Sequence, residues 1–270
     1  MTLAELFTLS PHGDDVYVGQ GHVYPWGGLY GGHIVAQALR ASSLTIDEGF
    51  VPHSLRAYFI RRGDFNEPVR YEVDRIRNGR SFCTRRVVAR QTIGAILNLE
   101  ASFQVTEKST EASPVVMASN LPRPDDLADD SWSPYFDRRM VPYDIMAAAQ
   151  RDGRGTSAGW FRLKQSFHND ELMNRCALAY ISDDLPTDAV VQAVPELKAV
   201  SGQDMLFSAS LDHTVWFHRP VQADHWHLYE MSCYTYIGGR GISFGYVFAE
   251  DGTHVATVAQ EVLIRLKESP

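Results

Sequence analysis

The chain has 270 residues, enough for one large domain or two smaller ones, and enough to bury a core without disulfides or metals. Hydrophobic residues make up 44% of the chain and charged residues 21%, a composition typical of folded globular proteins that argues against disorder. The net charge is −8 at pH 7. Because a nucleic-acid-binding surface is normally basic, we expect no nucleic-acid partner.

Three cysteines, Cys83, Cys176 and Cys233, are too few and too widely spaced for a disulfide framework, and no CxxC pair suggests a zinc ribbon. His225 and His227 lack a third ligand pattern, so neither a metal nor a cofactor is expected. The N-terminus has no basic and apolar signal region, and no apolar run approaches the roughly 18 residues of a membrane span. The sequence therefore predicts a soluble, cytoplasmic protein without a membrane span.

The first hundred residues predict a strand, a helix and then an antiparallel meander. The strand is expected over 16–23 and the helix over 33–41, after a glycine-rich stretch. The helix contains several alanines, which would let it lie close to a sheet. Turn signals such as Asn78-Gly79 separate the strands of the meander. These strands are expected over 52–61, 69–77, 81–91 and 94–105.

A segment rich in Pro, Ser and Asp, 107–155, is typical of a linker or a crossing segment. After it the same order of elements returns. A strand is expected over 160–167 and a helix over 170–183. The strands that follow are expected over 208–219, 227–237, 241–249 and 254–266.

The two halves also share letters at one offset of 158 residues. This offset takes the aromatic pair at Phe59 to that at Phe217, Tyr71 to Tyr229, and a turn glycine at 94 to one at 252. Such agreement indicates a duplication. We therefore expect an N-terminal repeat over 1–106, a linking segment over 107–155 and a C-terminal repeat over 156–270.

Two glycine-rich motifs suggest chemistry that their surroundings disfavour. Residues 241–245 fit the G-x-S-x-G nucleophile elbow, but Ser243 lies within strand-like alternation and no helix follows. The glycines over 27–32 lack the Lys-Ser or Lys-Thr of a phosphate loop. Glycines at the start of a helix still leave N–H groups free, and these can polarise a carbonyl or bind an anion.

The polar cluster around Asp212 resembles parts of a Ser-His-Asp triad. Alternation along a single strand places Ser210 and Asp212 on one face and His213 on the other. A triad from this cluster is therefore disfavoured. We expect His213 to pack or to form hydrogen bonds.

Two other polar residues interrupt apolar runs. Asp183 ends the run 177–182, and Gln260 lies within the run 255–262. Buried carboxylates and amides need polar partners. The pattern alone leaves two interpretations open: a turn Asp with an ordinary strand Gln, or two groups that converge on one water molecule.

Several motifs give the chain a resemblance to the type II acyl-CoA thioesterases, the TesB-like family, over nearly its whole length. The most specific is Leu211-Asp212-His213-Thr214-Val215-Trp216-Phe217-His218-Arg219-Pro220. The others are Tyr30-Gly31-Gly32-His33, Arg61-Arg62-Gly63-Asp64, Arg77-Asn78-Gly79-Arg80 and Ala101-Ser102-Phe103-Gln104, with Arg62 where the family usually has Pro. The resemblance implies an α+β double hotdog fold: two tandem hotdog repeats, each with a helix wrapped by an antiparallel sheet.

The resemblance also implies an acyl-CoA substrate, an attacking water and assembly into homo-oligomers. The residues that hold the water in the family fall on Asp183, Ser210 and Gln260, with Ser210 where Thr is usual. The neighbouring Asp184 leaves the choice of carboxylate open. Ser102 falls where Gln260 does at the repeat offset, so one working site per chain is expected.

Two other functions remain as alternatives. A hotdog enoyl-CoA hydratase would need an Asp/His pair and an Asn-Pro turn, which the sequence lacks. A non-catalytic acyl-CoA-binding hotdog protein would not need Asp183, Ser210 and Gln260 together. The sequence does not predict the length of the acyl chain or which arginines contact CoA.

Overall fold

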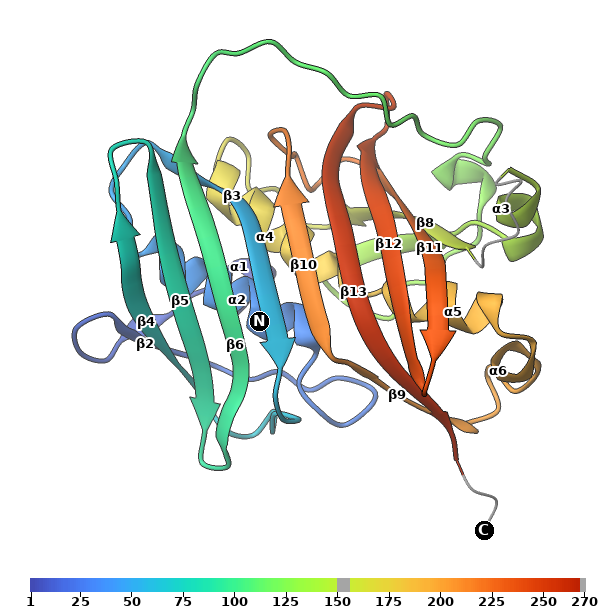
Figure 1. Cartoon of the computed structure of the whole chain (residues 1–270), viewed down its shortest axis with the longest axis horizontal. Helices are drawn as coiled ribbons and strands as arrows, with labels where there is room; N and C mark the ends of the chain where they lie inside the picture. Colours follow the sequence, from blue (N-terminus) through green and yellow to red (C-terminus); the bar gives the residue numbers. More distant parts are fainter. Residues whose placement is uncertain (150–155, 268–270) are drawn as a thin grey trace.

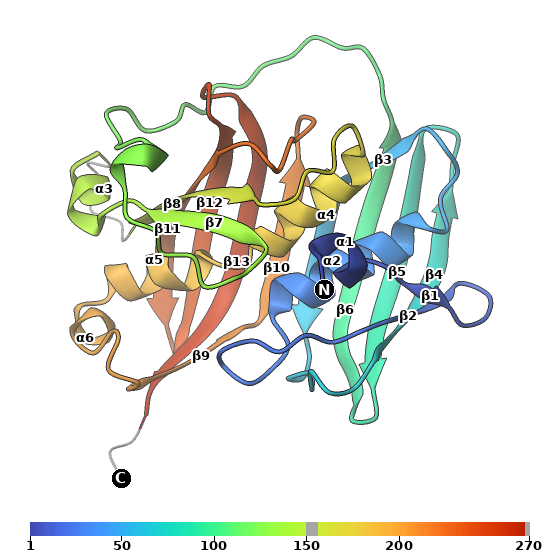
Figure 2. The same ribbon diagram turned by 180° about the vertical axis from the view of Figure 1, so that it is seen from behind.

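The strands of the chain form one extended antiparallel sheet, and the helices lie on one side of it (Figures 1 and 2). The structure is a computed structural model that describes residues 1–149 and 156–267. Within these residues the sheet has 13 strands in the order β1-β2-β4-β5-β6-β3-β10-β13-β12-β11-β8-β7, with β9 paired to β13.

The first repeat contains the meander that alternation predicted, wrapped around one long helix. β3 lies beside the second repeat and β2 lies towards the outer edge. The elements are α1 (Leu3–Leu6), β1 (Ser10–Pro11), β2 (Val16–Gly19), α2 (Gly31–Ser43), β3 (Phe50–Phe59), β4 (Val69–Asn78), β5 (Phe82–Gln91) and β6 (Gly94–Val105).

The second repeat has the same strand order, counted outwards from the centre of the sheet. The order β3-β6-β5-β4-β2 on one side corresponds to β10-β13-β12-β11-β8 on the other. This correspondence confirms the double hotdog fold. The elements are β8 (Thr156–Leu163), α4 (Glu171–Ile181), α5 (Pro186–Ala193), α6 (Pro195–Ala199), β9 (Leu206–Ser210), β10 (Asp212–Phe217), β11 (His227–Ile237), β12 (Arg240–Ala249) and β13 (His254–Leu266).

The linking segment 107–155 is more structured than a plain linker. Its first part runs from the end of β6 across one end of the sheet (Figure 1). Its later part contains η1 (Pro124–Asp126), β7 (Phe136–Met140) and α3 (Tyr143–Ala149). β7 pairs with β8, so this part extends the sheet of the second repeat. Residues 150–155 lie outside the described part of the chain.

The helices α2 and α4 pack against each other, and the end of α4 meets the start of α2. The contact depends on Gly32, since a Cβ there would lie 2.1 Å from the carbonyl oxygen of Tyr180. Small residues along α2, including the fully buried Ala36 and Ala38, let the helix lie close to the sheet. Among the described residues, no helix is long and apolar enough to cross a membrane.

The strand predicted over 208–219 is two strands, which is a correction with consequences for the site. Ser210 is opposite Val262, whereas Thr214 is opposite Ala259, so the pairing register changes by one residue between them. Such a bulge reverses the alternation of side chains beyond it. The helix expected over 33–41 is also longer at both ends, because it runs from Gly31 to Ser43.

Candidate active site

Asp183 lies two residues beyond the end of α4 and points towards the start of α2. Its Oδ2 accepts a hydrogen bond of 2.9 Å from the backbone N–H of Gly32, and its Oδ1 accepts one of 3.0 Å from the hydroxyl of Ser210. A Cβ at Gly31 would lie 2.4 Å from Oδ2. Because the two glycines at the start of α2 have no side chains, the carboxylate of Asp183 can lie close to the positive N-terminal end of this helix.

Ser210 and Gln260 complete a continuous hydrogen-bonded set with Asp183. The amide Nε2 of Gln260, on β13, donates to the Oγ of Ser210 at 2.8 Å, and this Oγ in turn donates to Asp183. Gln260 is 1% exposed and Asp183 is 8% exposed. The structure therefore brings together three polar groups that lie far apart in the sequence.

Burial and hydrogen bonding act on Asp183 in opposite directions. Desolvation raises the pKa of its carboxyl, while the hydrogen bonds from Ser210, Gln260 and Gly32 lower it. Desolvation prevails, and the pKa is raised from 3.8 to about 7. A carboxylate with a pKa near neutrality is suited to accept a proton from water at physiological pH.

The neighbouring Asp184 faces different partners. Its Oδ1 accepts from the indole N–H of Trp132 at 2.6 Å, and its Oδ2 accepts from the guanidinium of Arg138 at 2.8 Å. These contacts bind Asp184 to the linking segment. Of the doublet, only Asp183 contacts Ser210.

His213 lies closer to this set than alternation along a single strand predicts. Its Nδ1 is hydrogen-bonded to the Oε1 of Gln260, and its Nε2 lies 2.8 Å from the Oγ of Ser182. The expectation that Ser210 and Asp212 share a face, opposite to His213, is wrong. The bulge after Ser210 turns both Ser210 and His213 towards Gln260, whereas Asp212 accepts from the N–H of Glu261.

The Gly32 N–H and the Ser182 hydroxyl were also missed as members of the site. The glycine pair before a predicted helix was the available signal for Gly32. Nothing local marks Ser182, because its contact to His213 spans two segments that only the fold brings together.

The other motifs do not join the site. Ser243 lies in the middle of β12 and its hydroxyl is buried, without a hydrogen-bond partner among the described residues, so it is not a nucleophile elbow. His227 bonds to the carbonyl oxygen of His225. Over residues 1–149 and 156–267, no group of three His, Cys, Asp or Glu side chains could hold a metal ion.

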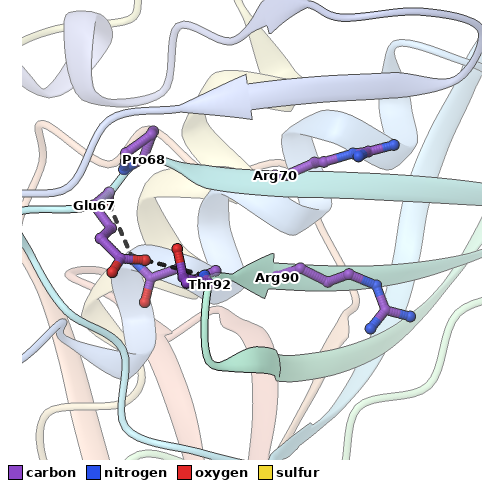
Figure 3. A pocket seen from close by; sticks show the side chains of 6 residues that line it. Glu67, Pro68, Arg70, Arg90 and Thr92 are labelled. Atoms are coloured by element: carbon purple, nitrogen blue, oxygen red, sulfur yellow. Dashed lines mark hydrogen bonds between the residues drawn. The ribbon is translucent and has the colours of Figure 1, made fainter.

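A shallow surface hollow at the ends of β4 and β5 is separate from Asp183, Ser210 and Gln260 (Figure 3). The carboxylate of Glu67 accepts from the N–H of Thr92 at 3.0 Å there. The two arginines of the hollow, Arg70 and Arg90, both pair with Glu72. The charged groups of the hollow are thus paired within the chain.

The first repeat has no counterpart of the amide. His213 and Gln260 are the neighbours on β10 and β13, and the corresponding neighbours on β3 and β6 are Leu55 and Ala101. The expectation that Ser102 replaces Gln260 is therefore off by one residue, because the strand pairing differs by one residue between the repeats: Val87 is opposite Leu99, whereas Gly245 is opposite Val258. The side chains of Leu55 and Ala101 offer no hydrogen-bonding group at this position.

Comparison with known proteins shows which family the chain belongs to. Family models described as the acyl-CoA thioesterase N-terminal and C-terminal domains match residues 22–104 and 111–264. The chain belongs to the acyl-CoA thioesterase family. These two matches cover one hotdog repeat each, with most of the linking segment in the second.

Several members of the acyl-CoA thioesterase family match nearly the whole length of this chain. The chain is 31% identical to acyl-CoA thioesterase 2 of Haemophilus influenzae, over 98% of each protein. It is 34% identical to acyl-coenzyme A thioesterase 8 of Mus musculus, over 98% of this chain and 89% of that protein. The structure of acyl-CoA thioesterase II TesB2 from Mycobacterium marinum matches with a TM-score of 0.86 and 33% identity over 100% of both chains.

Proposed function

We propose that this protein hydrolyses acyl-CoA to a free carboxylic acid and CoA, and that Asp183, Ser210 and Gln260 hold the attacking water. The observation that carries the proposal is the hydrogen-bonded set of these three side chains at the start of α2. The membership of the chain in the thioesterase family supports the same reaction.

In this proposal Asp183 is the general base. It takes a proton from water as the water oxygen attacks the thioester carbonyl. Ser210 and Gln260 orient the water, which supplies the correct approach geometry. The tetrahedral intermediate then expels the CoA sulfur, which takes the proton from Asp183.

The developing oxyanion needs a donor near Asp183. The N–H of Gly31, at the first position of α2, has no hydrogen-bond partner among the described residues, while the next N–H is bound to Asp183. We assign the Gly31 N–H to the thioester oxygen. A donor of this kind contributes roughly 3 kcal/mol to the stabilisation of the transition state.

The direct test is CoA release from acyl-CoAs ranging from acetyl to palmitoyl, with branched and aromatic members. The absorbance of the thioester bond is the readout, because it needs no thiol reagent and is therefore independent of the three cysteines of the chain. We expect hydrolysis of at least one chain-length class. Folded protein that hydrolyses none of them would instead favour the non-catalytic acyl-CoA-binding function, and water addition to an enoyl-CoA would favour the hydratase.

Ser210 offers a matched pair of variants. Ser210→Ala removes the donor to Asp183 and the acceptor for Gln260, so we expect kcat to fall by about 10- to 100-fold with little change in KM. Ser210→Thr keeps the hydroxyl and adds a methyl group that restricts its rotamers, so activity should stay within a few-fold of wild type. Equal losses in both variants would contradict the role assigned to the hydroxyl.

Three further properties belong to the proposal. We place the repeat boundaries at 1–106, 107–155 and 156–270. The buried, unpaired cysteines support a reducing compartment such as the cytoplasm.

Exposed apolar side chains on the sheet, among them Tyr58 and Ile242, support a homo-oligomer. Light scattering after size-exclusion chromatography should give a multiple of 30.3 kDa, and a single species of that mass would contradict the oligomer.

A further inference from the structure

The buried imidazole of His213 has no role in the proposed mechanism, yet it lies between two polar groups. One is the amide oxygen of Gln260, and the other is the hydroxyl of Ser182. His213 has no exposed surface, and it lies beyond direct reach of Asp183 in the hydrogen-bond chain. We propose that His213 is a positioning residue that fixes the amide orientation of Gln260, and through it the direction of the Ser210 hydroxyl.

The direction of each hydrogen bond follows from the ionised carboxylate. Asp183 can only accept when ionised, so the Ser210 hydroxyl donates its single hydrogen to Oδ1. Ser210 must then accept from its other neighbour, which requires the Nε2 of Gln260 on that side. The Oε1 of Gln260 therefore faces His213.

The orientation of the amide in turn sets the tautomer of His213. Because Oε1 is an acceptor, the facing Nδ1 of His213 must carry the hydrogen. Its Nε2 is then an acceptor, and at 2.8 Å it competes with the carbonyl oxygen of Ala179, at 3.1 Å, for the single hydroxyl hydrogen of Ser182. A continuous chain of donors thus runs from His213 through Gln260 and Ser210 to Asp183.

The environment of His213 suits this role. Burial lowers its pKa to about 4, so the ring is neutral at physiological pH and offers one donor and one acceptor. A cationic ring would offer two donors and no acceptor for Ser182. The sheet holds the ring in place, since His213 lies opposite Ala57 of β3 and its neighbour Thr214 lies opposite Ala259 of β13.

Without His213 the amide of Gln260 is free to turn over. With its oxygen towards Ser210, the amide would compete with Asp183 for the single hydroxyl hydrogen, and the water would lose a fixed partner. This loss affects the orientation of the water rather than the binding of acyl-CoA. The inference rests on the proposed function, and it predicts an effect on kcat with KM nearly unchanged.

Two substitutions separate the donor from the bulk of the ring. His213→Leu keeps a similar volume and removes the donor, and we expect kcat to fall by about tenfold or more. His213→Asn places an amide N–H near the position of Nδ1, so it should recover most of that loss. His227→Leu, a buried histidine of β11 outside the site, controls for the loss of a buried ring and should leave kcat unchanged.

The decisive measurement is a double-mutant cycle with Gln260→Ala. If His213 acts through Gln260, His213→Leu lowers kcat in the wild-type background and causes no further loss in the Gln260→Ala background. Losses that multiply in the double variant would overturn the inference. So would an equal loss in His213→Leu and His213→Asn.

A second readout does not depend on activity. Nitrogen NMR of the histidine-labelled wild-type protein at neutral pH should show a neutral His213 ring with the hydrogen on Nδ1, a signal that is altered in Gln260→Ala. A hydrogen on Nε2 would overturn the inference even in an active enzyme. Absence of hydrolysis by the wild type would refute the proposed function, while this spectrum would still decide the orientation of Gln260.

Discussion

Replacement of Asp183 by Asn should lower kcat by at least about 10³-fold, because the variant keeps the shape of the side chain and loses the base. The amide can still accept from Gly32, so the fold should persist, which circular dichroism would verify. The acyl-CoA hydrolysed fastest by the wild type is the substrate for this comparison.

Asp184→Asn is the matched control. Its carboxylate contacts Trp132 and Arg138 instead of Ser210, so this variant should keep most of the activity and lose some stability. Full activity of Asp183→Asn together with an inactive, folded Asp184→Asn would move the base to the second member of the doublet.

The pH dependence of the wild type should follow the same carboxylate. The base must be ionised, so kcat/KM should rise with pH and level off above about 7, the raised pKa of Asp183. A plateau that already begins near pH 4 would show that the base titrates at an ordinary carboxyl pKa.

The free energy of unfolding should fall as pH rises over the range in which activity increases. Between the ordinary pKa of 3.8 and the folded-state pKa of about 7, folding takes up a proton at Asp183. The contribution of Asp183 to the free energy of unfolding is therefore full below the lower value and is lost as pH rises to 7. Since Asn does not titrate, Asp183→Asn should gain stability relative to wild type by up to about 1.4 kcal/mol per pH unit in this window.

Gly32→Ala is expected to destabilise the fold strongly. Helix propensity alone would favour Ala over Gly by about 1 kcal/mol. The new Cβ, however, would lie 2.1 Å from the backbone oxygen of Tyr180, which cannot move without separating α2 from α4. We expect a net loss of at least about 2 kcal/mol in the free energy of unfolding, measured by urea denaturation.

Gly31→Ala is the informative companion to this variant. Its Cβ would meet the carboxylate of Asp183 and the ring of Phe59, which are side chains rather than backbone. This variant should lose more activity and less stability than Gly32→Ala. If Gly32→Ala were as stable as wild type, the close approach of the two helices would be contradicted.

The duplicated architecture could be predicted from the sequence, and so could the identity of the three site residues. Alternation of apolar residues placed the strands of both meanders, and the common offset of Phe59 and Phe217 indicated the repeat. These features are local or periodic, so they can be recognised in the amino-acid sequence. The roles of Asp183, Ser210 and Gln260 came from the family resemblance, since the pattern alone left an ordinary turn Asp and strand Gln equally open.

Only the tertiary structure decided which groups meet. A one-residue change in strand pairing after Ser210 turned His213 inward, and a one-residue difference in register between the two repeats made Ala101, instead of Ser102, the counterpart of Gln260. Strand register depends on hydrogen bonds between segments distant in the chain, and a shift of one residue moves every side chain to the other face. The contact of Gly32 with Asp183 likewise exists only because the end of α4 lies beside the start of α2, two helices from different repeats.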